Sequence, residues 1–292
     1  VIIMLGVVGS IIYLPGFLHP VSPTSTTATA LARVTLTPSI GSTIQSVPGV
    51  SAATQTAKQK ELSTQTKGAP TIQGFRAADQ WATPVPTSVS SCGFANNTYI
   101  VNMSTPNQYM PCLAAKTAFM NVVMQVTMKI QGDAGGIIFR SNPLSKVYYR
   151  LSVNQSDATT PTADTFSLIV CNDDCTNNSV SSGTPLMNNA NSLVHVDRKQ
   201  PIKLAVIANI NTFDVFINGQ FVASFADTMY TAPWSGQIGV YAASLGKDTT
   251  VTFSNLKVWS LDHSTTQPTG KPTSTSTSPS VILPTVVKSQ GA

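Results

Sequence analysis

Apolar and polar residues alternate with a period of two along much of this chain, and this pattern limits the possible folds more than any other. In residues 121–131 every second side chain from Val122 to Ile130 is apolar, and from residue 125 onward the residues that alternate with them are polar: Gln125, Thr127, Lys129 and Gln131. Successive side chains of a β-strand point to opposite faces of a sheet, so this segment is predicted to be a half-buried strand. In the range 74–259 no segment has a convincing 3.6-residue apolar period, which disfavours helices there.

Strand patterns of this kind recur at short intervals, which predicts an all-β domain. Asn218-Gly219 stands between two of them, and this dipeptide is a strong signal for a tight hairpin turn. Many antiparallel strands with turn signals are typical of a sandwich or barrel, and a domain of about 190 residues favours a two-sheet antiparallel jelly-roll sandwich. The other predicted strands are residues 136–140, 147–153, 166–171, 202–208, 213–218, 220–225, 236–243 and 250–259.

Charge is distributed in a way that excludes a nucleic-acid-binding protein. The formal net charge is +5, but eleven Lys and Arg residues in the range 74–263 face eleven Asp residues there. The folded part is therefore neutral, and the excess positive charge lies in the flanking segments. A nucleic-acid-binding domain concentrates basic residues on its folded surface, so we exclude that class.

The scarcity of acidic and metal-ligating residues argues against most catalytic sites. The single glutamate, Glu61, excludes a glycosidase built on paired glutamates, although aspartates could substitute for them. The aspartates never form a close i, i+2 pair on a predicted strand. The three His and four Cys are too scattered for a metalloenzyme cluster, and no zinc site is expected. We therefore predict no catalytic residues, no cofactor and a chain that is not an enzyme.

The four cysteines are predicted to form two disulfides. An even number of cysteines is typical of a domain exported to an oxidising compartment. Sequence proximity pairs Cys92 with Cys112 and Cys171 with Cys175. The three-residue spacing inside the second pair argues against a redox motif, which needs two intervening residues and a helix N-terminus.

The N-terminal segment is predicted to cross a membrane. Residues 1–18 carry no charge and are nearly long enough for a membrane-spanning helix, which needs about 20 residues. We expect a transmembrane helix at residues 1–20 whose first turns lie upstream, in a single-pass cell-membrane protein with an extracellular β domain. A signal peptide cleaved near Ala30-Leu31-Ala32 is the alternative, and it too exports the domain.

Ser, Thr and Pro dominate the segments on either side of the domain. Residues 21–70 and 264–292 offer too little apolar surface to offset the entropy cost of ordering. We therefore expect a disordered stalk and a disordered tail, with the β-sandwich domain at residues 71–263.

Several short segments carry a resemblance to a known superfamily. They are residues 135–140 (GGIIFR), 148–151 (YYRL), 166–168 (FSL), 203–206 (KLAV), 212–220 (TFDVFINGQ), 236–241 (GQIGVY) and 251–258 (VTFSNLKV). Their sequence and order resemble the laminin-G and concanavalin A-like sandwich group, and are similar to its 3-keto-disaccharide hydrolase-like domain. They are also similar to the extracellular C-terminal domains of certain bacterial membrane Ser/Thr protein kinases, and residues 92–112 resemble that version in particular.

The resemblance implies a concanavalin A-like jelly roll over residues 74–259 and leaves room for a kinase domain upstream of this chain. The superfamily contains lectins, glucanases and pure interaction modules, so the fold alone does not settle the function. Its glucanase branch carries a Glu-x-Asp-x-x-Glu signature on one strand. Since the range 74–259 contains no glutamate, that activity is not carried over to this chain.

Strand parity predicts a ligand-binding face. In residues 147–153, Tyr149 and the apolar residues that alternate with it point to the core, so Tyr148 and Arg150 point away from it. The same parity places Arg140 on that face if the two strands are neighbours. An aromatic ring beside guanidinium groups suits stacking on sugars and recognition of hydroxyl or carboxylate groups. The alternative is that the arginines pair with aspartates or cover the sheet with their aliphatic stems.

Two loops carry further candidates. Tyr230 and Trp234 form a second aromatic candidate for ligand binding, and the alternative is that the Trp plugs the end of the core. Asp173 and Asp174, with amide oxygens nearby, are a weak candidate for calcium, which takes several oxygen ligands. A surface turn closed by the disulfide is the plainer alternative there.

Together these patterns predict a non-catalytic extracellular ligand-binding or sensor module, with carbohydrate, cell-envelope material or a protein segment as its ligand. Two alternatives stay open, namely an aspartate-based carbohydrate-active hydrolase and a structural adhesion or spacer domain. A concave groove lined by polar and aromatic residues favours a binding module, whereas a face filled by side chains favours a spacer.

Overall fold

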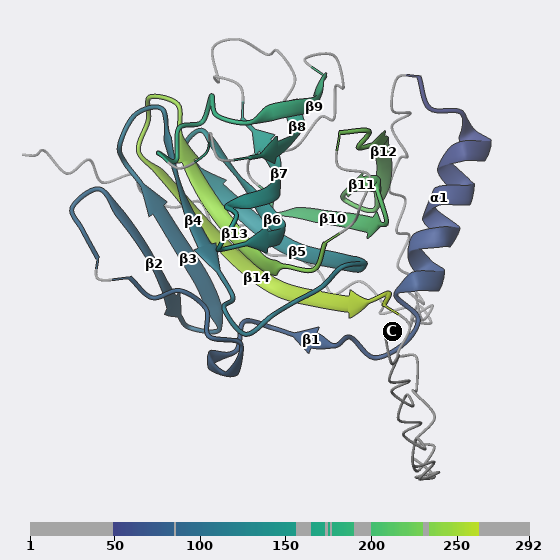
Figure 1. The fold of residues 1–292 in the computed structure, drawn as a ribbon, viewed down its shortest axis with the longest axis horizontal. Coiled ribbons are helices and arrows are strands. Elements are labelled where there is room, and N and C mark those ends of the chain that lie inside the picture. Colours follow the sequence, from purple (N-terminus) through teal and green to yellow (C-terminus); the bar gives the residue numbers. More distant parts are fainter. Residues whose placement is uncertain are drawn as a thin grey trace, which may run out of the picture. The chain divides into compact units, whose positions relative to one another are not determined.

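Two antiparallel sheets make up most of the described part of the chain (Figure 1). They contain fourteen strands, and the same residues include one α-helix, α1 (Ala52–Gln65), and one short 3-10 helix, η1 (Ala77–Asp79). The two-sheet antiparallel β-sandwich predicted from the alternation is confirmed. The structure describes residues 49–84, 86–155, 165–172, 175, 177–189, 200–229 and 234–262.

The first sheet has eight strands, with β5 and β14 near its centre. β5 pairs with β10 on one side and β14 on the other, so Val126 lies opposite Leu204 and Met128 opposite Phe253. In order across the sheet the strands are β12 (Gln220–Ala226), β11 (Thr212–Ile217), β10 (Ile202–Asn209), β5 (Val122–Gln131), β14 (Thr249–Ser260), β3 (Thr98–Met103) and β2 (Ser90–Ala95), with β1 (Ile72–Gln73) paired to β14.

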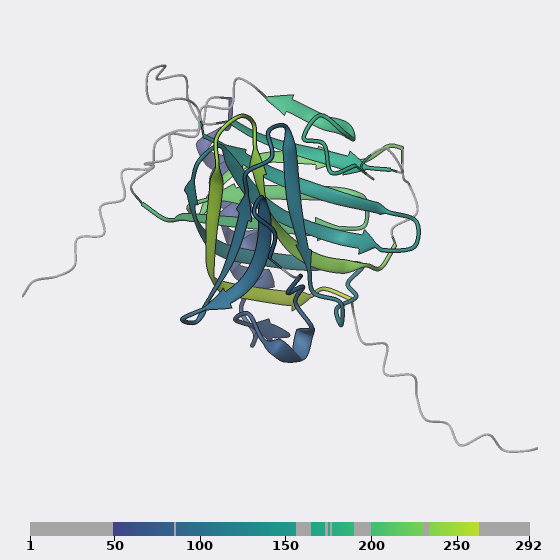
Figure 2. The same cartoon turned by 90° about the vertical axis from the view of Figure 1, so that its left-hand side faces the viewer.

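The second sheet has six strands, and its strands are seen from another side in Figure 2. β7 lies between β6 and β8, so Tyr149 has Phe139 on one side and Val170 on the other. In order the strands are β4 (Gln108–Leu113), β13 (Gln237–Ser244), β6 (Ala134–Asn142), β7 (Val147–Asn154), β8 (Thr165–Cys171) and β9 (Thr184–Asn189).

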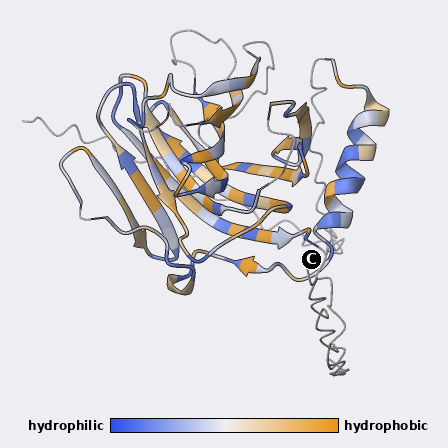
Figure 3. Cartoon of the chain, viewed as in Figure 1, coloured by the Kyte–Doolittle hydropathy of each residue, from blue (hydrophilic) through white to orange (hydrophobic). Residues whose placement is uncertain are grey.

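The apolar residues of the alternation fill the core of the sandwich. Met124, Val126 and Met128 of β5 belong to the same buried cluster as Tyr149 and Leu151 of β7. Figure 3 shows apolar and polar residues following one another along β14. A fully buried side chain of this size stabilises the fold by about 1.5–3 kcal/mol relative to an exposed one. Core packing therefore decides which face of each strand points inward.

A helix stands where the sequence predicts part of a disordered stalk. α1 packs on the far side of the eight-stranded sheet, where Phe216 and Phe221 belong to a second apolar cluster that Leu62 contacts. None of the helical residues is fully buried. The expectation of a stalk up to residue 70 is wrong for α1, because the sheet supplies the apolar surface that the segment itself lacks.

Local contacts define where α1 begins and how it is held. The Ser51 hydroxyl accepts a hydrogen bond from the Thr54 N–H at 3.1 Å, which caps the first turn. Lys58 Nζ lies 2.6 Å from Asp214 Oδ2 of β11 and 3.0 Å from Glu61 Oε2. Partial burial lowers the pKa of Lys58, but the hydrogen bonds to these two carboxylates outweigh burial and raise it. An ion pair thus ties the helix to the sheet.

Both predicted disulfides are present. Cys92 of β2 pairs with Cys112 of β4, which links the two sheets, and Cys171 pairs with Cys175 at the end of β8. Closing the loop of the first pair, with a sequence separation of 20, stabilises the fold by about 3 kcal/mol in the loop-entropy model. Two disulfides are typical of an extracellular or secreted domain.

The predicted membrane-spanning segment, residues 1–20, lies outside the described residues, as does the predicted tail at 264–292. Within the described part of the chain, no helix combines the length and the apolar character needed to cross a membrane.

Candidate functional site

The outer face of the six-stranded sheet, which is turned away from the core, carries a group of polar and aromatic side chains. On β7, Tyr148 and Arg150 point to this face, as strand parity predicts. Neighbouring strands add Tyr109 from β4, Tyr241 from β13 and Ser167 from β8. The strand β6 lies between β13 and β7 and has no bulky polar residue on this face. With β6 included, five neighbouring strands form this surface.

A segment that we call the strap, residues 177–183, crosses this outer face. It follows the second disulfide at the end of β8 and reaches the opposite edge of the sheet, where the Val180 N–H donates to the Asn107 carbonyl oxygen at 3.0 Å. It returns to β9 through Gly183, whose φ is +94°. A Cβ at Gly183 would lie 2.8 Å from the Val170 carbonyl oxygen, so this return requires glycine.

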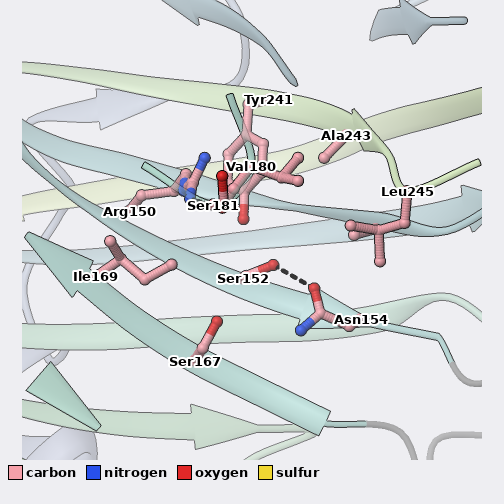
Figure 4. A pocket seen from close by; sticks show the side chains of 11 residues that line it. Arg150, Ser152, Asn154, Ser167, Ile169, Val180, Ser181, Tyr241, Ala243 and Leu245 are labelled. Carbon is pink, nitrogen blue, oxygen red and sulfur yellow. Dashed lines mark hydrogen bonds between the residues drawn. The ribbon is translucent and has the colours of Figure 1, made fainter. Parts of the chain in front are cut away.

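Two hollows lie along the strap. The first hollow, of about 180 Å³, is lined by Ala134, Arg150, Ser152, Asn154, Ser167, Ile169, Val180, Ser181, Tyr241, Ala243 and Leu245 (Figure 4). The second hollow, of about 190 Å³, is lined by Pro111, Leu113, Ile138, Ser141, Lys146, Tyr148, Cys175 and Asn178. The strap therefore fills part of the outer face and leaves a cavity on either side.

Arg150 lies between two tyrosine rings beneath the strap. Its guanidinium carbon is 4.2 Å from the centre of the Tyr109 ring and 5.7 Å from the centre of the Tyr241 ring. Its Nη2 donates to the Val180 carbonyl oxygen at 2.9 Å, which fixes the strap over the sheet. The side chain is only 2% exposed, yet its Nε and Nη1 have no hydrogen-bond partner.

The hydroxyl groups of the first hollow are also incompletely bonded. The Tyr241 hydroxyl is buried without a partner within hydrogen-bond distance. Burial raises the pKa of Tyr241 to about 12, against the opposing effects of the Arg150 charge and of the nearby Ser152 hydroxyl, so the group stays protonated and can donate. The Ser152 hydroxyl donates to Asn154 Oδ1 at 2.7 Å, and Ser167 lines the same wall (Figure 4). The hollow thus offers donors from three strands.

Arg140 does not lie on the outer face, so this part of the parity prediction is wrong. The pairing of β6 with β7 shifts between Phe139 and Asn142, and Arg140 has a left-handed φ of 52°. This bulge turns the side chain toward the core, where its guanidinium carbon lies 5.4 Å from the Phe213 ring and 5.9 Å from the Tyr149 ring. Alternation cannot predict such a reversal. An extra residue at a bulge changes which side chains of the strand point to the core and which point to the outer face.

Bonds to three oxygens hold the Arg140 guanidinium at this end of the sandwich. Nε donates to the Met120 carbonyl oxygen and Nη1 to the Ile210 carbonyl oxygen, both at 2.5 Å, and Nη2 donates to Asn121 Oδ1 at 3.4 Å. Burial lowers the pKa of Arg140, against the opposing effects of Tyr149 and nearby carboxylates. These contacts give Arg140 a structural role in joining two loops.

Trp234 lies at the same end as Arg140. Its ring stacks on Tyr149 with 5.2 Å between the centres, and its Nε1 donates to the Arg140 carbonyl oxygen at 2.6 Å. This arrangement matches the alternative in which the Trp closes the end of the core. Tyr230, the other aromatic candidate of that loop, lies outside the described residues.

Tyr148 lies on the predicted face but is not an exposed stacking platform. It is 9% exposed, and its hydroxyl is hydrogen-bonded to the hydroxyl of Tyr109. It packs with Cys171 and Cys175 in the apolar cluster of the outer face. The strap and its disulfide cover the ring, and strand parity gives no sign of such a cover.

Several residues of the first hollow were not singled out in the sequence. Tyr241 and Ser167 alternate with core residues on β13 and β8, so parity alone could place them on an outer face. Parity does not reveal which strands are neighbours, and that pairing brings them to Arg150.

The calcium candidates Asp173 and Asp174 lie outside the described residues. Among the residues that are described, no group of three His, Cys, Asp or Glu side chains could hold a metal ion.

No family model matches the chain, and no curated protein matches it. Similar solved structures include the carbohydrate-binding module CBM66 from Bacillus subtilis, with 15% identity, a TM-score of 0.44 and coverage of 62% of this chain and 95% of that chain. A protein of unknown function with a galectin-like fold from Bacillus subtilis has 11% identity, a TM-score of 0.44 and coverage of 66% and 96%. The kappa-carrageenase from Pseudoalteromonas carrageenovora has 11% identity, a TM-score of 0.39 and coverage of 64% and 90%. At these values the likenesses carry no argument about this chain.

Proposed function

We propose that this domain is a non-catalytic saccharide-binding module and that the outer face of the six-stranded sheet is its binding surface. The observation that carries the proposal is the first hollow, where hydroxyl, amide and guanidinium groups stand beside an aromatic ring and apolar walls. Sites for small ligands combine apolar walls with a few polar groups in this way. Sugars suit such a site, because their hydroxyl groups form hydrogen bonds with polar groups and their C–H groups pack on aromatic rings.

The size of the first hollow supports recognition of a single sugar unit. Its volume of about 180 Å³ is below the roughly 300–1,000 Å³ of pockets that enclose a drug-sized ligand. A terminal or side-chain unit of a glycan would enter, and the rest of the chain would lie outside along the strap.

The lining supports binding rather than hydrolysis. Glycoside hydrolysis requires two carboxyl groups on either side of the scissile bond. Among the described residues, neither hollow is lined by an Asp or a Glu. The strap fills part of the face, which favours the other alternative, a spacer domain without a ligand. Binding measurements distinguish a binding module from a spacer.

The experiment is a screen of the whole chain on an array of neutral and acidic glycans, followed by calorimetry on the strongest hits. Ser167→Phe places a bulky ring in the first hollow and should weaken binding at least tenfold. Thr127→Phe makes a similar change on β5 of the other sheet and is the matched control, which should bind like the unmodified chain. Absence of any glycan binding, or equal binding by Ser167→Phe, contradicts the proposal.

We also propose that residues 1–20 anchor the module to the membrane, as the ectodomain of a receptor-like kinase would be. The support is the uncharged run of residues 1–18 together with the two disulfides, which are typical of export. Protease added to intact cells should release the β domain and leave a membrane-bound stub. Full protection of the domain, or its free release into the medium without protease, contradicts anchoring.

A further inference from the structure

Arg150 carries a positive charge inside the protein without a negative partner. Its side chain is 2% exposed. In the described part of the chain, the ion pairs join Lys58 to Glu61 and Asp214, and Arg76 to Asp79. None of them includes Arg150. A buried charge without a partner costs several kcal/mol, so a chain keeps one where the charge has a use.

The hydrogen bonds of Arg150 are incomplete as well. A guanidinium has five N–H donors. Nη2 donates to the Val180 carbonyl oxygen at 2.9 Å and lies 3.5 Å from the Ser182 carbonyl oxygen, whereas Nε and Nη1 have no partner. The rings of Tyr109 and Tyr241 offer the cation their π faces, with their centres 4.2 and 5.7 Å from the guanidinium carbon, but bring no negative charge.

Arg150, which carries the unpaired donors, lines the first hollow next to the Tyr241 hydroxyl and the Ser152 hydroxyl, which already donates to Asn154 Oδ1. Arg150, Tyr241 and Ser152 line the same space beneath strap residues 180 and 181 (Figure 4). The Tyr241 hydroxyl has no partner either. Apolar residues such as Ile169 close the remaining wall. Charge interactions are stronger in such a place than in bulk water, because the local dielectric constant is lower.

Neutral and anionic ligands satisfy this set of groups differently. The hydroxyls of a neutral sugar can accept hydrogen bonds from Tyr241 and Ser167, but they leave the guanidinium charge of Arg150 uncompensated. A carboxylate or sulfate accepts several hydrogen bonds and neutralises the charge at the same time. An acidic sugar also brings the ring that fits the apolar walls.

We propose that the first hollow selects saccharides that carry an anionic group, carboxylate or sulfate, and that Arg150 binds this group directly. The inference rests on the proposed saccharide-binding function and adds the class of ligand. The Tyr241 hydroxyl, with that of Ser167 in the same lining, completes the set of donors around the anion, and the remainder of the sugar packs on the apolar walls.

The glycan array with the whole chain gives the first test. Acidic glycans, namely uronates, sialosides and sulfated sugars, should dominate the hits. Calorimetry then compares the strongest acidic hit with the same glycan after methyl esterification or desulfation. Charge-assisted hydrogen bonds of this kind predict a preference of about 10- to 100-fold for the anionic form.

Two variants, each with one positive charge removed, distinguish direct binding of the anionic group by Arg150 from attraction by the net charge of the protein. Arg150→Met should abolish the preference for the anionic form, while its thermal unfolding midpoint changes little, because removal of an unpaired buried charge offsets the lost bond to the Val180 carbonyl oxygen. Lys129→Met removes an exposed charge from β5 of the other sheet and should keep the preference. A stable Arg150→Met protein also shows that lost binding does not reflect unfolding.

The outcomes distinguish this inference from the function on which it rests. If neutral glycans bind and esterification changes nothing, the inference falls and saccharide binding stands. If no glycan binds, both fall. If sodium sulfate or acetate binds as tightly as the acidic glycan, the hollow takes an inorganic or simple anion only, and the saccharide class is wrong. If Lys129→Met loses the preference for the anionic glycan to the same extent as Arg150→Met, the preference comes from net charge and the proposed role of Arg150 is wrong.

Discussion

Two buried arginines, ten residues apart on neighbouring strands, have opposite surroundings. Arg140, at the bulge of β6, is 1% exposed and donates to three oxygens of the Met120–Asn121 and Ile210 loops. Arg150, in the middle of β7, is 2% exposed and donates to the strap through Nη2 alone. Neither has a carboxylate within ion-pair distance in the described part of the chain.

The difference teaches how to separate a structural arginine from a candidate binding arginine when both are buried. Arg140 satisfies carbonyl groups of loops that would otherwise lack donors, so the fold depends on it. Arg150 has donors to spare beside a hollow, so the fold gains less from it than its burial costs. The two arginines are buried to the same degree. They differ in the number of guanidinium N–H groups that have no hydrogen-bond acceptor.

The largest effect is expected from Arg140→Met. The Met120 and Ile210 carbonyl oxygens would lose their guanidinium donors, and hydrogen bonds from a charged donor each contribute about 1.5–3 kcal/mol. The free energy of unfolding, measured by urea denaturation, should fall by about 3 kcal/mol. The unfolding free energy of Arg150→Met, measured in the same way, is the matched comparison and should change by less than about 1 kcal/mol, because the lost bond to the Val180 carbonyl oxygen is offset by removal of an unpaired buried charge. Equal losses at the two positions would remove the distinction between them.

Tyr148→Ala should have the next largest effect. The ring lies between the sheet and the strap and is 9% exposed, so its removal leaves a cavity in the outer-face cluster. We expect a loss of about 2–3 kcal/mol in unfolding free energy, somewhat less than for a residue of the central core. Tyr148→Phe keeps the ring and should cost about 1 kcal/mol, since only the hydroxyl contact with Tyr109 is lost. A neutral Tyr148→Ala would show that the strap leaves this ring uncovered in solution.

Two tyrosines sharpen the comparison further, because one lies beside each arginine. The Tyr149 hydroxyl donates to the buried Asp227 carboxylate at 2.6 Å, whereas the Tyr241 hydroxyl has no partner. Tyr149→Phe should therefore cost about 2 kcal/mol. Tyr241→Phe should stay within about 0.5 kcal/mol of the unmodified chain. Denaturation curves of both variants at pH 7 test this, and a large loss in Tyr241→Phe would mean that its hydroxyl is bonded in solution.

The smallest effect is expected at a cation that is paired with carboxylates, Lys58. Its side chain is 28% exposed and bridges α1 to Asp214, and partly exposed ion pairs contribute about 0–1 kcal/mol. Lys58→Met should lower the unfolding free energy by no more than about 1 kcal/mol, but should speed proteolytic cleavage within α1. Lys60→Met, an exposed position of the same helix, is the control and should leave the cleavage rate unchanged. Unchanged cleavage in Lys58→Met would show that apolar contacts alone hold α1.

Local patterns in the amino-acid sequence are enough to predict several features of this protein. The alternation in residues 121–131 predicted β5 and its buried face, because side chains of a strand alternate wherever the strand lies. The same rule placed Tyr148 and Arg150 on the outer face. Sequence proximity paired the cysteines correctly. These features depend on residues that are close together in the chain, so a single sequence is enough to predict them.

The positions of the unpaired donors, and the residues that lie beside them, follow from the packing of distant segments and could not be predicted from local patterns. The bulge at Arg140 reverses a face, α1 becomes a helix on the surface of the other sheet, and the strap covers Tyr148 and reaches over Arg150. Each depends on contacts between segments that are distant in the chain. Hydrophobic periodicity carries no information about such contacts, because it reports which way a residue points and not what lies opposite. The hollow beside Arg150 therefore exists only once four strands and the strap have come together.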